Sequence, residues 1–91
     1  MSSHLALIER SNGKDLKRVE VQLTFTESSP GRHHWRGEFL SPSAAGILPN
    51  ERLSLTLATG EKGTIRVRET HFNSRTPDAT LIHFTGMGPL A

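Results

Sequence analysis

The sequence contains no cysteine and no tyrosine, and its 91 residues include only one tryptophan and four phenylalanines. Without cysteine, neither a disulfide framework nor a thiolate metal site can stabilise the chain, so the packing of its core must suffice. The scarcity of aromatic side chains argues against a surface dedicated to stacking nucleic-acid bases. No apolar run approaches the length that a membrane-spanning helix requires, so no membrane partner is expected.

A large excess of one charge is missing as well. Eleven Lys and Arg against nine Asp and Glu give a formal net charge of +2, so the electrostatic field of the whole molecule is weak. Eight of the eleven cations are arginines, whose forked guanidinium suits local contacts with carboxylates and phosphates. The N-terminal segment lacks the basic and apolar regions of a signal peptide, and we expect a soluble, cytoplasmic protein.

The chain is rich in alternating apolar and polar residues, the pattern of a strand with one dry and one wet face. Six short stretches show this pattern, most clearly residues 19–25, and glycine, proline or asparagine ends each of them. The first stretch, residues 4–10, fits either a helix or a strand. Asn12 and Gly13 follow it and favour a strand, because Asn-Gly supplies the positive φ angles of a hairpin turn.

Matching the apolar faces predicts which residues lie opposite each other in three hairpins. The expected pairs are Leu5–Val21, Leu7–Val19 and Glu9–Lys17 in the first hairpin, Val21–Phe39, Leu23–Gly37 and Phe25–Trp35 in the second, and Leu55–Val67 and Leu57–Ile65 in the third. The odd-numbered residues from 19 to 39 would then share one dry interior. Phe72 has the opposite parity to Val67, which predicts a β-bulge near Arg68 or Glu69.

These elements predict an all-β fold, a small six-stranded antiparallel barrel or strongly curled sheet built from hairpins, as a single domain over residues 1–91. Closure into a barrel would remove exposed sheet edges. It would require the first and last strands to meet. After the sixth strand, residues 86–91 either fold Leu90 back onto the core or offer a docking strand.

Residues 41–50 form the longest break in the strand pattern. Ser41 and Pro42 predict a short helical turn near residues 42–47, with Ser41 as its cap and Pro42 in its first position. Ile47 and Leu48 follow the turn, and we expect them to plug one end of the barrel.

Arginines gather on the wet faces of the predicted strands. Arg52, Arg66 and Arg68 share one face with no acidic residue among them, which suits phosphate binding, although arginines also solubilise exposed strands. Arg32 and Arg36 enclose a cluster with two histidines and Trp35. This cluster resembles a base-stacking platform, but Trp35 has the parity of Phe39 and is expected in the core.

Part of the same segment resembles a known family. PilZ domains are small barrels that bind cyclic dinucleotide and carry an RxxxR motif followed by a [D/N]xSxxG motif. Arg32 and Arg36 match the first spacing, and Ser41-Pro-Ser43-Ala-Ala-Gly46 is similar to the second, with Ser41 at the acid or amide position. Only residues 37–40 separate the two motifs, fewer than in that family. The resemblance covers residues 32–46 and indicates only where a ligand would bind.

Signals for metal binding and catalysis are weak. Glu69, His71 and His83 share one face of the last hairpin, but no tight ligand spacing supports a metal site. The sequence has no nucleophile elbow, no phosphate-binding loop and no converging pair of carboxylates. We therefore expect no enzymatic activity, no metal and no cofactor.

The sequence leads to two hypotheses about function. The first is a non-enzymatic β-barrel module that binds another protein, because sharp turns and apolar residues combine in the loop at residues 41–50. The expected contact residues in this loop are Ser43, Ile47, Leu48 and Asn50. The second is binding of an anion, a nucleotide or a nucleic acid through an arginine-rich strand face. The residues expected to bind it are Arg32, Arg36, Arg52, Arg66 and Arg68.

Overall fold

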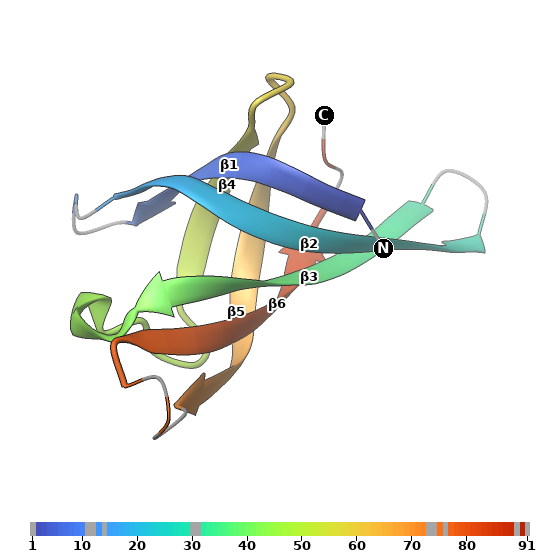
Figure 1. The fold of residues 1–91 in the computed structure, drawn as a ribbon. Coiled ribbons are helices and arrows are strands. Elements are labelled where there is room, and N and C mark those ends of the chain that lie inside the picture. The colour runs from blue at the N-terminus through green and yellow to red at the C-terminus, as the bar shows by residue number, and fades with distance from the viewer. Residues whose placement is uncertain are drawn as a thin grey trace.

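The computed structural model describes residues 2–10, 13, 15–29, 32–72, 75, 77–88 and 90, with the side chains of residues 17, 26–29, 32 and 33 outside the description. The described residues form six strands and one short 3-10 turn (Figure 1). The elements are β1 (Ser2–Arg10), β2 (Leu16–Ser29), β3 (Arg32–Pro42), the 3-10 turn (Ser43–Ala45), β4 (Arg52–Leu57), β5 (Lys62–Phe72) and β6 (Ala79–Met87). Across these residues, no helix is long and apolar enough to cross a bilayer.

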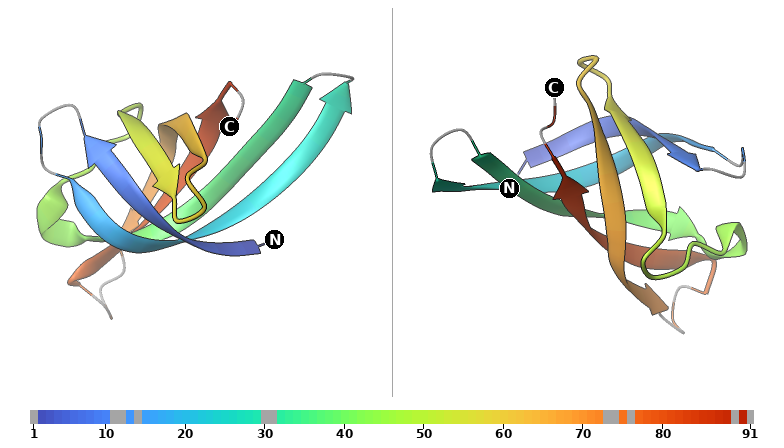
Figure 2. Two further views of the ribbon diagram at one scale, coloured as in Figure 1. Left: turned by 90° about the horizontal axis from the view of Figure 1, so that it is seen from above. Right: turned by 180° about the vertical axis from the view of Figure 1, so that it is seen from behind.

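The six strands close into an antiparallel barrel with the order β1-β2-β3-β6-β5-β4. Two three-stranded meanders, β1-β2-β3 and β4-β5-β6, meet along both edges, because β1 pairs with β4 and β3 pairs with β6. Figure 2 shows the two meanders wrapping around a common interior. The predicted all-β barrel is confirmed. The expectation that the first and last strands pair to close the barrel was wrong. Instead β1 pairs with β4 and β6 pairs with β3.

The interior of the barrel is mostly apolar and receives side chains from all six strands. Its buried hydrophobic residues are Ala6, Ile8, Val21, Leu23, Trp35, Phe39, Ile47, Leu53, Leu55, Leu57, Ile65, Val67, Ile82 and Phe84. Trp35 is buried while its neighbour His34 is exposed, so the predicted assignment of dry and wet faces is confirmed there. Phe25 is an exception and is exposed. At that level, β2 and β3 have passed their last partners in β1 and β6 and continue as a two-stranded ribbon.

The second hairpin has the predicted register. Phe25 lies opposite Trp35, Leu23 opposite Gly37 and Val21 opposite Phe39. Gly37 has to be a glycine, because a Cβ atom there would lie 2.7 Å from Cζ of Phe84 and closer still to the backbone of β2. The missing side chain allows the Phe84 ring to cross the inner face of β3.

The first hairpin differs from its prediction, because Leu5 lies opposite Glu20 and Ala6 opposite Val19. Ala6 and Ile8 are therefore buried and Leu5 is exposed. The predicted pairs of Leu5 with Val21, Leu7 with Val19 and Glu9 with Lys17 were wrong. The register also shifts between Ala6 and Ile8, opposite a stretch of β2 in which Arg18 has a φ of 55°. Such a β-bulge adds a residue to one strand, which parity alone does not predict.

The third hairpin keeps its predicted faces but not its register. Leu53 lies opposite Ile65 and Leu55 opposite Gly63, so the predicted pairs of Leu57 with Ile65 and Leu55 with Val67 were wrong. The backbone N–H of Leu57 donates to the Glu61 carbonyl at 2.8 Å, which tightens the turn at residues 58–60. The shift amounts to an even number of residues, and therefore every apolar side chain stays inside.

The predicted bulge in β5 is confirmed. The register between β5 and β6 shifts between Val67 and Glu69, which leaves Arg68 as the extra residue. Phe72 has the parity of the inner face beyond this bulge, but it lies at the end of β5 and is exposed. The bulge turns both Arg68 and Glu69 toward the outer surface, where both are exposed.

The connection from β3 to β4 closes one end of the barrel. A 3-10 turn is present as predicted, but Ser41 does not cap it, since Ser41 is buried and its hydroxyl donates to the Pro42 carbonyl. Pro42 occupies the cap position instead of the first position of the turn. Ile47 is 7% exposed and plugs the barrel as expected, whereas Leu48 is 65% exposed and does not.

A buried ion pair holds this connection in place. Nε of Arg10 donates to Oε2 of Glu51 at 2.8 Å, and Nη2 of Arg10 donates to Oε1 at 3.1 Å. The same guanidinium donates to the Ala45 carbonyl. The side chains of Arg10 and Glu51 are 6% and 19% exposed. This forked pair joins the end of β1 to the connection from β3 to β4.

The other end of the barrel is closed by an indole ring. Trp35 lies against Gly63 and Gly86, where Cβ atoms would meet its ring, and its edge faces Phe84 with ring centroids 6.2 Å apart. Nε1 of Trp35 donates to the Gly88 carbonyl at 2.8 Å. Leu90 packs against the core beside it, so the expectation that Leu90 folds back is confirmed.

Candidate anion-binding surface

Three arginines form a row across four neighbouring strands on the outer surface of the barrel. Arg36 of β3 lies opposite Thr85 of β6, Thr85 lies opposite Arg66 of β5, and Arg66 lies opposite Arg52 of β4. We call Arg36, Thr85, Arg66 and Arg52 the arginine row. Adjacent strands are about 4.8 Å apart, so the row extends over about 14 Å of the surface.

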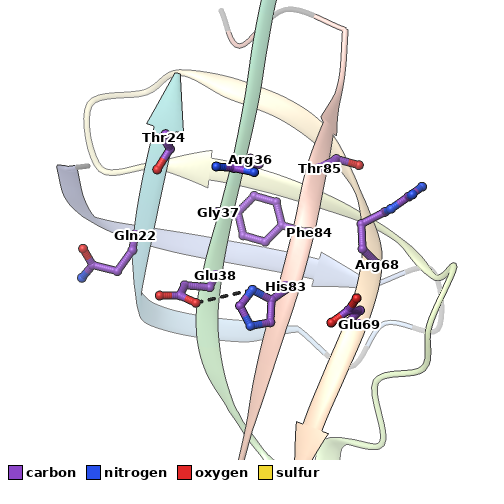
Figure 3. A pocket seen from close by; sticks show the side chains of 10 residues that line it. All are labelled: Gln22, Thr24, Arg36, Gly37, Glu38, Arg68, Glu69, His83, Phe84 and Thr85. Carbon is purple, nitrogen blue, oxygen red and sulfur yellow. Dashed lines mark ion pairs between the residues drawn. The ribbon is translucent and has the colours of Figure 1, made fainter. Parts of the chain in front are cut away.

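Arg68 adds a fourth guanidinium beside this row. The bulge in β5 exposes Arg68, and together with Arg36 it lines a groove of about 420 Å³ on the outer surface of β2, β3, β6 and β5. We call this hollow the outer groove. Figure 3 shows Arg36 and Arg68 on either side of Thr85, with the Phe84 ring behind the strands. Arg36 of β3 and Arg66 and Arg68 of β5 therefore flank Thr85 of β6 from both neighbouring strands.

None of these four guanidiniums has a carboxylate partner within the part of the chain that the structure describes. Arg10 shows the contrast, because its guanidinium is buried and fully engaged by Glu51 and the Ala45 carbonyl. Arg36, Arg52 and Arg68 are exposed and Arg66 is half-buried. Their cationic charge is thus concentrated in one place and available to an anion, although the net charge of the chain is only +2.

A row of carboxylates and histidines lies next to the arginine row. Glu38 of β3 lies opposite His83 of β6, and His83 lies opposite Glu69 of β5. Nδ1 of His83 is 3.4 Å from Oε2 of Glu38, as the dashed line in Figure 3 marks. His71 is 2.9 Å from Glu69 through Nε2 and Oε2, and its ring lies 5.0 Å from that of His83.

The predicted proximity of Glu69, His71 and His83 is therefore confirmed. Their carboxylate and imidazole groups face each other in pairs. Among the described residues, no three His, Cys, Asp or Glu side chains are placed to hold a metal ion.

The structure brings together four of the five residues that were predicted to bind an anion. Arg36 lies beside Thr24 on the wet face as expected, and Arg52, Arg66 and Arg68 adjoin it through β6. The side chain of Arg32 falls outside the described residues. Thr85, which completes the surface, was missed from the sequence, because only the pairing of β3 with β6 places it beside Arg36. The sequence placed Glu38 on the wet face opposite Gln22, as the structure shows, but did not indicate it as part of this surface.

The predicted protein-binding loop offers less accessible surface than expected. Ile47 belongs to the core, and the Ser43 hydroxyl is 2.9 Å from that of Thr80 in a hydrogen bond. Leu48 and Asn50 are exposed. Asn50 has a φ of 68°, and its backbone N–H donates to the Val67 carbonyl at 2.8 Å, so its position is fixed by the barrel.

No family model, no curated protein and no solved structure matches the chain. The likeness of residues 32–46 to PilZ domains therefore remains a local resemblance.

Proposed function

We propose that this protein is a non-enzymatic binding module that holds an anionic ligand on the outer surface of its barrel. The residues that contact the anion are Arg36, Arg52, Arg66 and Arg68. The observation that carries the proposal is the arginine row, in which guanidiniums from three strands share one surface without a carboxylate partner in the described residues. The proposal also includes a cytoplasmic location and the absence of a catalytic step, both expected from the sequence.

The length of the row leaves room for a ligand with one anionic group or with several. Arg36 and Arg66 are separated by β6, which places their backbones about 10 Å apart. A single phosphate or carboxylate would contact part of the row, whereas a chain of anionic groups could extend along all of it. Arginine is suited to such groups because its fork donates two hydrogen bonds to one phosphate or carboxylate.

The burial of Ile47 is the reason for preferring this function to binding through the loop at residues 41–50. Ile47 contributes to the barrel core and Ser43 bonds to Thr80, so two of the four expected contact residues are already engaged. The arginines, in contrast, are brought close to other arginines when the barrel closes. Like charges are kept together at a cost in free energy, which a bound anion would remove.

Titration with inorganic tripolyphosphate, followed by calorimetry, tests the proposal. We expect Arg66→Ala to weaken binding about tenfold or more, because a hydrogen bond to a charged group is lost. Affinity should also fall steeply between about 50 and 200 mM NaCl. Lys62→Ala is the matched control, since it removes the same charge from the same strand at a distance of four residues. No binding at low salt, or equal loss in the two variants, would refute the proposed site.

A further inference from the structure

The outer surface of β3 and β6 carries three kinds of chemistry in a fixed order. Along β3 the outward side chains are Arg36, Glu38 and Leu40, and along β6 their partners are Thr85, His83 and Leu81. With increasing distance from the ribbon end of β3, the surface thus changes from cationic to acidic to apolar. Leu40 is 61% exposed, so the apolar part is not covered by the protein itself.

The apolar part is hollowed and continuous with the outer groove. Leu40, Pro42 and Leu81 line a second hollow of about 540 Å³, which also includes Arg18 and Glu20 on its β2 side. Gln22 and Glu38 border both hollows, so the two adjoin along β2 and β3. One trough therefore runs along the strands from the arginine row to the exposed leucine.

The three kinds of side chain are two residues apart on each strand, which corresponds to about 6.6 Å. An extended peptide repeats its side chains on one face with the same period. A peptide that lies along β3 and β6 would therefore place alternate side chains over the arginine, carboxylate and leucine positions in turn.

We propose that the ligand of this surface is an extended segment of a partner protein with the alternating pattern acidic, basic, apolar. The acidic side chain contacts Arg36 and Arg68, the basic side chain contacts Glu38 and Glu69, and the apolar side chain contacts Leu40 and Leu81. The acidic end of this assignment rests on the proposed function. The basic position in the middle rests on the carboxylates of the outer groove, and the apolar position at the other end rests on the exposed leucine beside it.

The acidic middle of the trough distinguishes this occupant from a nucleic acid or a polyphosphate. A phosphate chain running along the trough would meet Glu38 and Glu69 directly after the arginines and would be repelled by them. Leu40 and Leu81 would give such a chain no favourable contact. A peptide of mixed charge satisfies all three parts, because each has a complementary side chain.

Two fluorescein-labelled peptides of equal composition test the order of the pattern by fluorescence anisotropy. The first contains Glu-Thr-Lys-Thr-Leu and the second contains Lys-Thr-Glu-Thr-Leu, which matches the trough in neither chain direction. We expect the first peptide to bind about tenfold more tightly, since the second places like charges opposite each other at two positions. Equal affinities would overturn the peptide proposal.

A charge reversal then identifies the carboxylate. Glu38→Lys should invert the preference, so that a Glu-Thr-Glu-Thr-Leu peptide binds this variant more tightly than the Glu-Thr-Lys-Thr-Leu peptide. Leu40→Ser should weaken binding of every peptide, whereas Lys62→Ala should leave all affinities unchanged. Circular dichroism checks that the three variants keep the barrel, and none of the substituted side chains is buried. An unchanged preference in Glu38→Lys would refute the assignment.

The tripolyphosphate titration separates this inference from the proposed function. If tripolyphosphate binds in an Arg66-dependent manner and the two isomeric peptides bind equally, the anion site stands and the peptide proposal fails. If neither tripolyphosphate nor any peptide binds, both fail. If a short oligonucleotide binds more tightly than the matched peptide, the partner is a nucleic acid and the peptide proposal is overturned.

Discussion

The two ends of the barrel are closed in different ways. At one end, Trp35 lies on Gly63 and Gly86, where a side chain on either glycine would meet the indole ring. At the other end, Arg10 and Glu51 form a forked ion pair beneath the connection from β3 to β4. We call these the tryptophan end and the ion-pair end. The first depends on shape and the second on charge.

This difference sets what each end tolerates. The tryptophan end needs a large ring and the absence of neighbouring Cβ atoms, so its closure fails when volume is removed or added. The ion-pair end needs both charges or neither, since a single charge left in a buried place is costly whereas an apolar pair is not. Both ends also fix an otherwise separate segment, Gly88 and Leu90 of the tail in one case and the connection at residues 43–51 in the other.

The largest effect is expected at the tryptophan end. Trp35→Ala should reduce the free energy of unfolding by about 3 to 5 kcal/mol, because a buried ring is replaced by a cavity. A domain of this size has about 5 to 9 kcal/mol in total, so the variant would be marginally stable. Urea unfolding followed by far-UV circular dichroism measures the change without relying on the lost tryptophan.

Two further variants sharpen this result. Trp35→Phe keeps a ring in place but removes the Nε1 donor to the Gly88 carbonyl, and we expect a loss of about 1 to 2 kcal/mol. Phe25→Ala is the control, because Phe25 lies opposite Trp35 in the sheet but is exposed, and it should change little. A similar loss for Phe25→Ala and Trp35→Ala would show that shape complementarity does not close this end.

A smaller effect is expected at the ion-pair end. Arg10→Met should cost about 2 to 4 kcal/mol, because Glu51 is left nearly buried without its cation. The value lies slightly below that of a fully buried pair, since Glu51 keeps some solvent contact and accepts a bond from the Leu48 backbone N–H. Thermal and urea unfolding of the purified variant measure it.

The matched control is the double variant Arg10→Met with Glu51→Leu. It should recover most of the lost stability, because two apolar side chains replace two charges in the same space. Equal stability of the single and double variants would mean that the connection from β3 to β4 is held by its backbone bonds and by Ile47, and not by the ion pair.

The ends also show how far the sequence predicted the structure. The alternation of residues alone placed Trp35 in the core. The second hairpin has its apolar residues at odd-numbered positions, and residues 28–31 have a composition typical of a turn. The first hairpin was ambiguous, since residues 5–8 are apolar at both parities and a bulge adds a residue opposite them. The ion pair could not be predicted, because Arg10 and Glu51 are 41 residues apart and meet only after the barrel closes.

The same distinction applies to the candidate site. Sequence parity placed Arg36, Arg52, Arg66 and Arg68 on the wet face, which required only the period of a strand. It did not show that Arg36 lies two strands from Arg66, because β3 and β6 are not joined by a hairpin and no local signal specifies their pairing. Thr85 beside Arg36 and His83 beside Glu38 became visible only with this pairing.

The smallest effect is expected within the ion-pair end, where two adjacent apolar residues have opposite surroundings. Leu48→Ala should change the free energy of unfolding by less than about 0.5 kcal/mol, whereas Ile47→Ala should reduce it by about 2 kcal/mol or more. Chemical denaturation of both variants gives the comparison directly. A large loss for Leu48→Ala would mean that this residue packs against the barrel and that the end is closed by both side chains, as the sequence had predicted. A small loss makes Leu48→Ala a folded variant in which binding through the loop can be measured separately from stability.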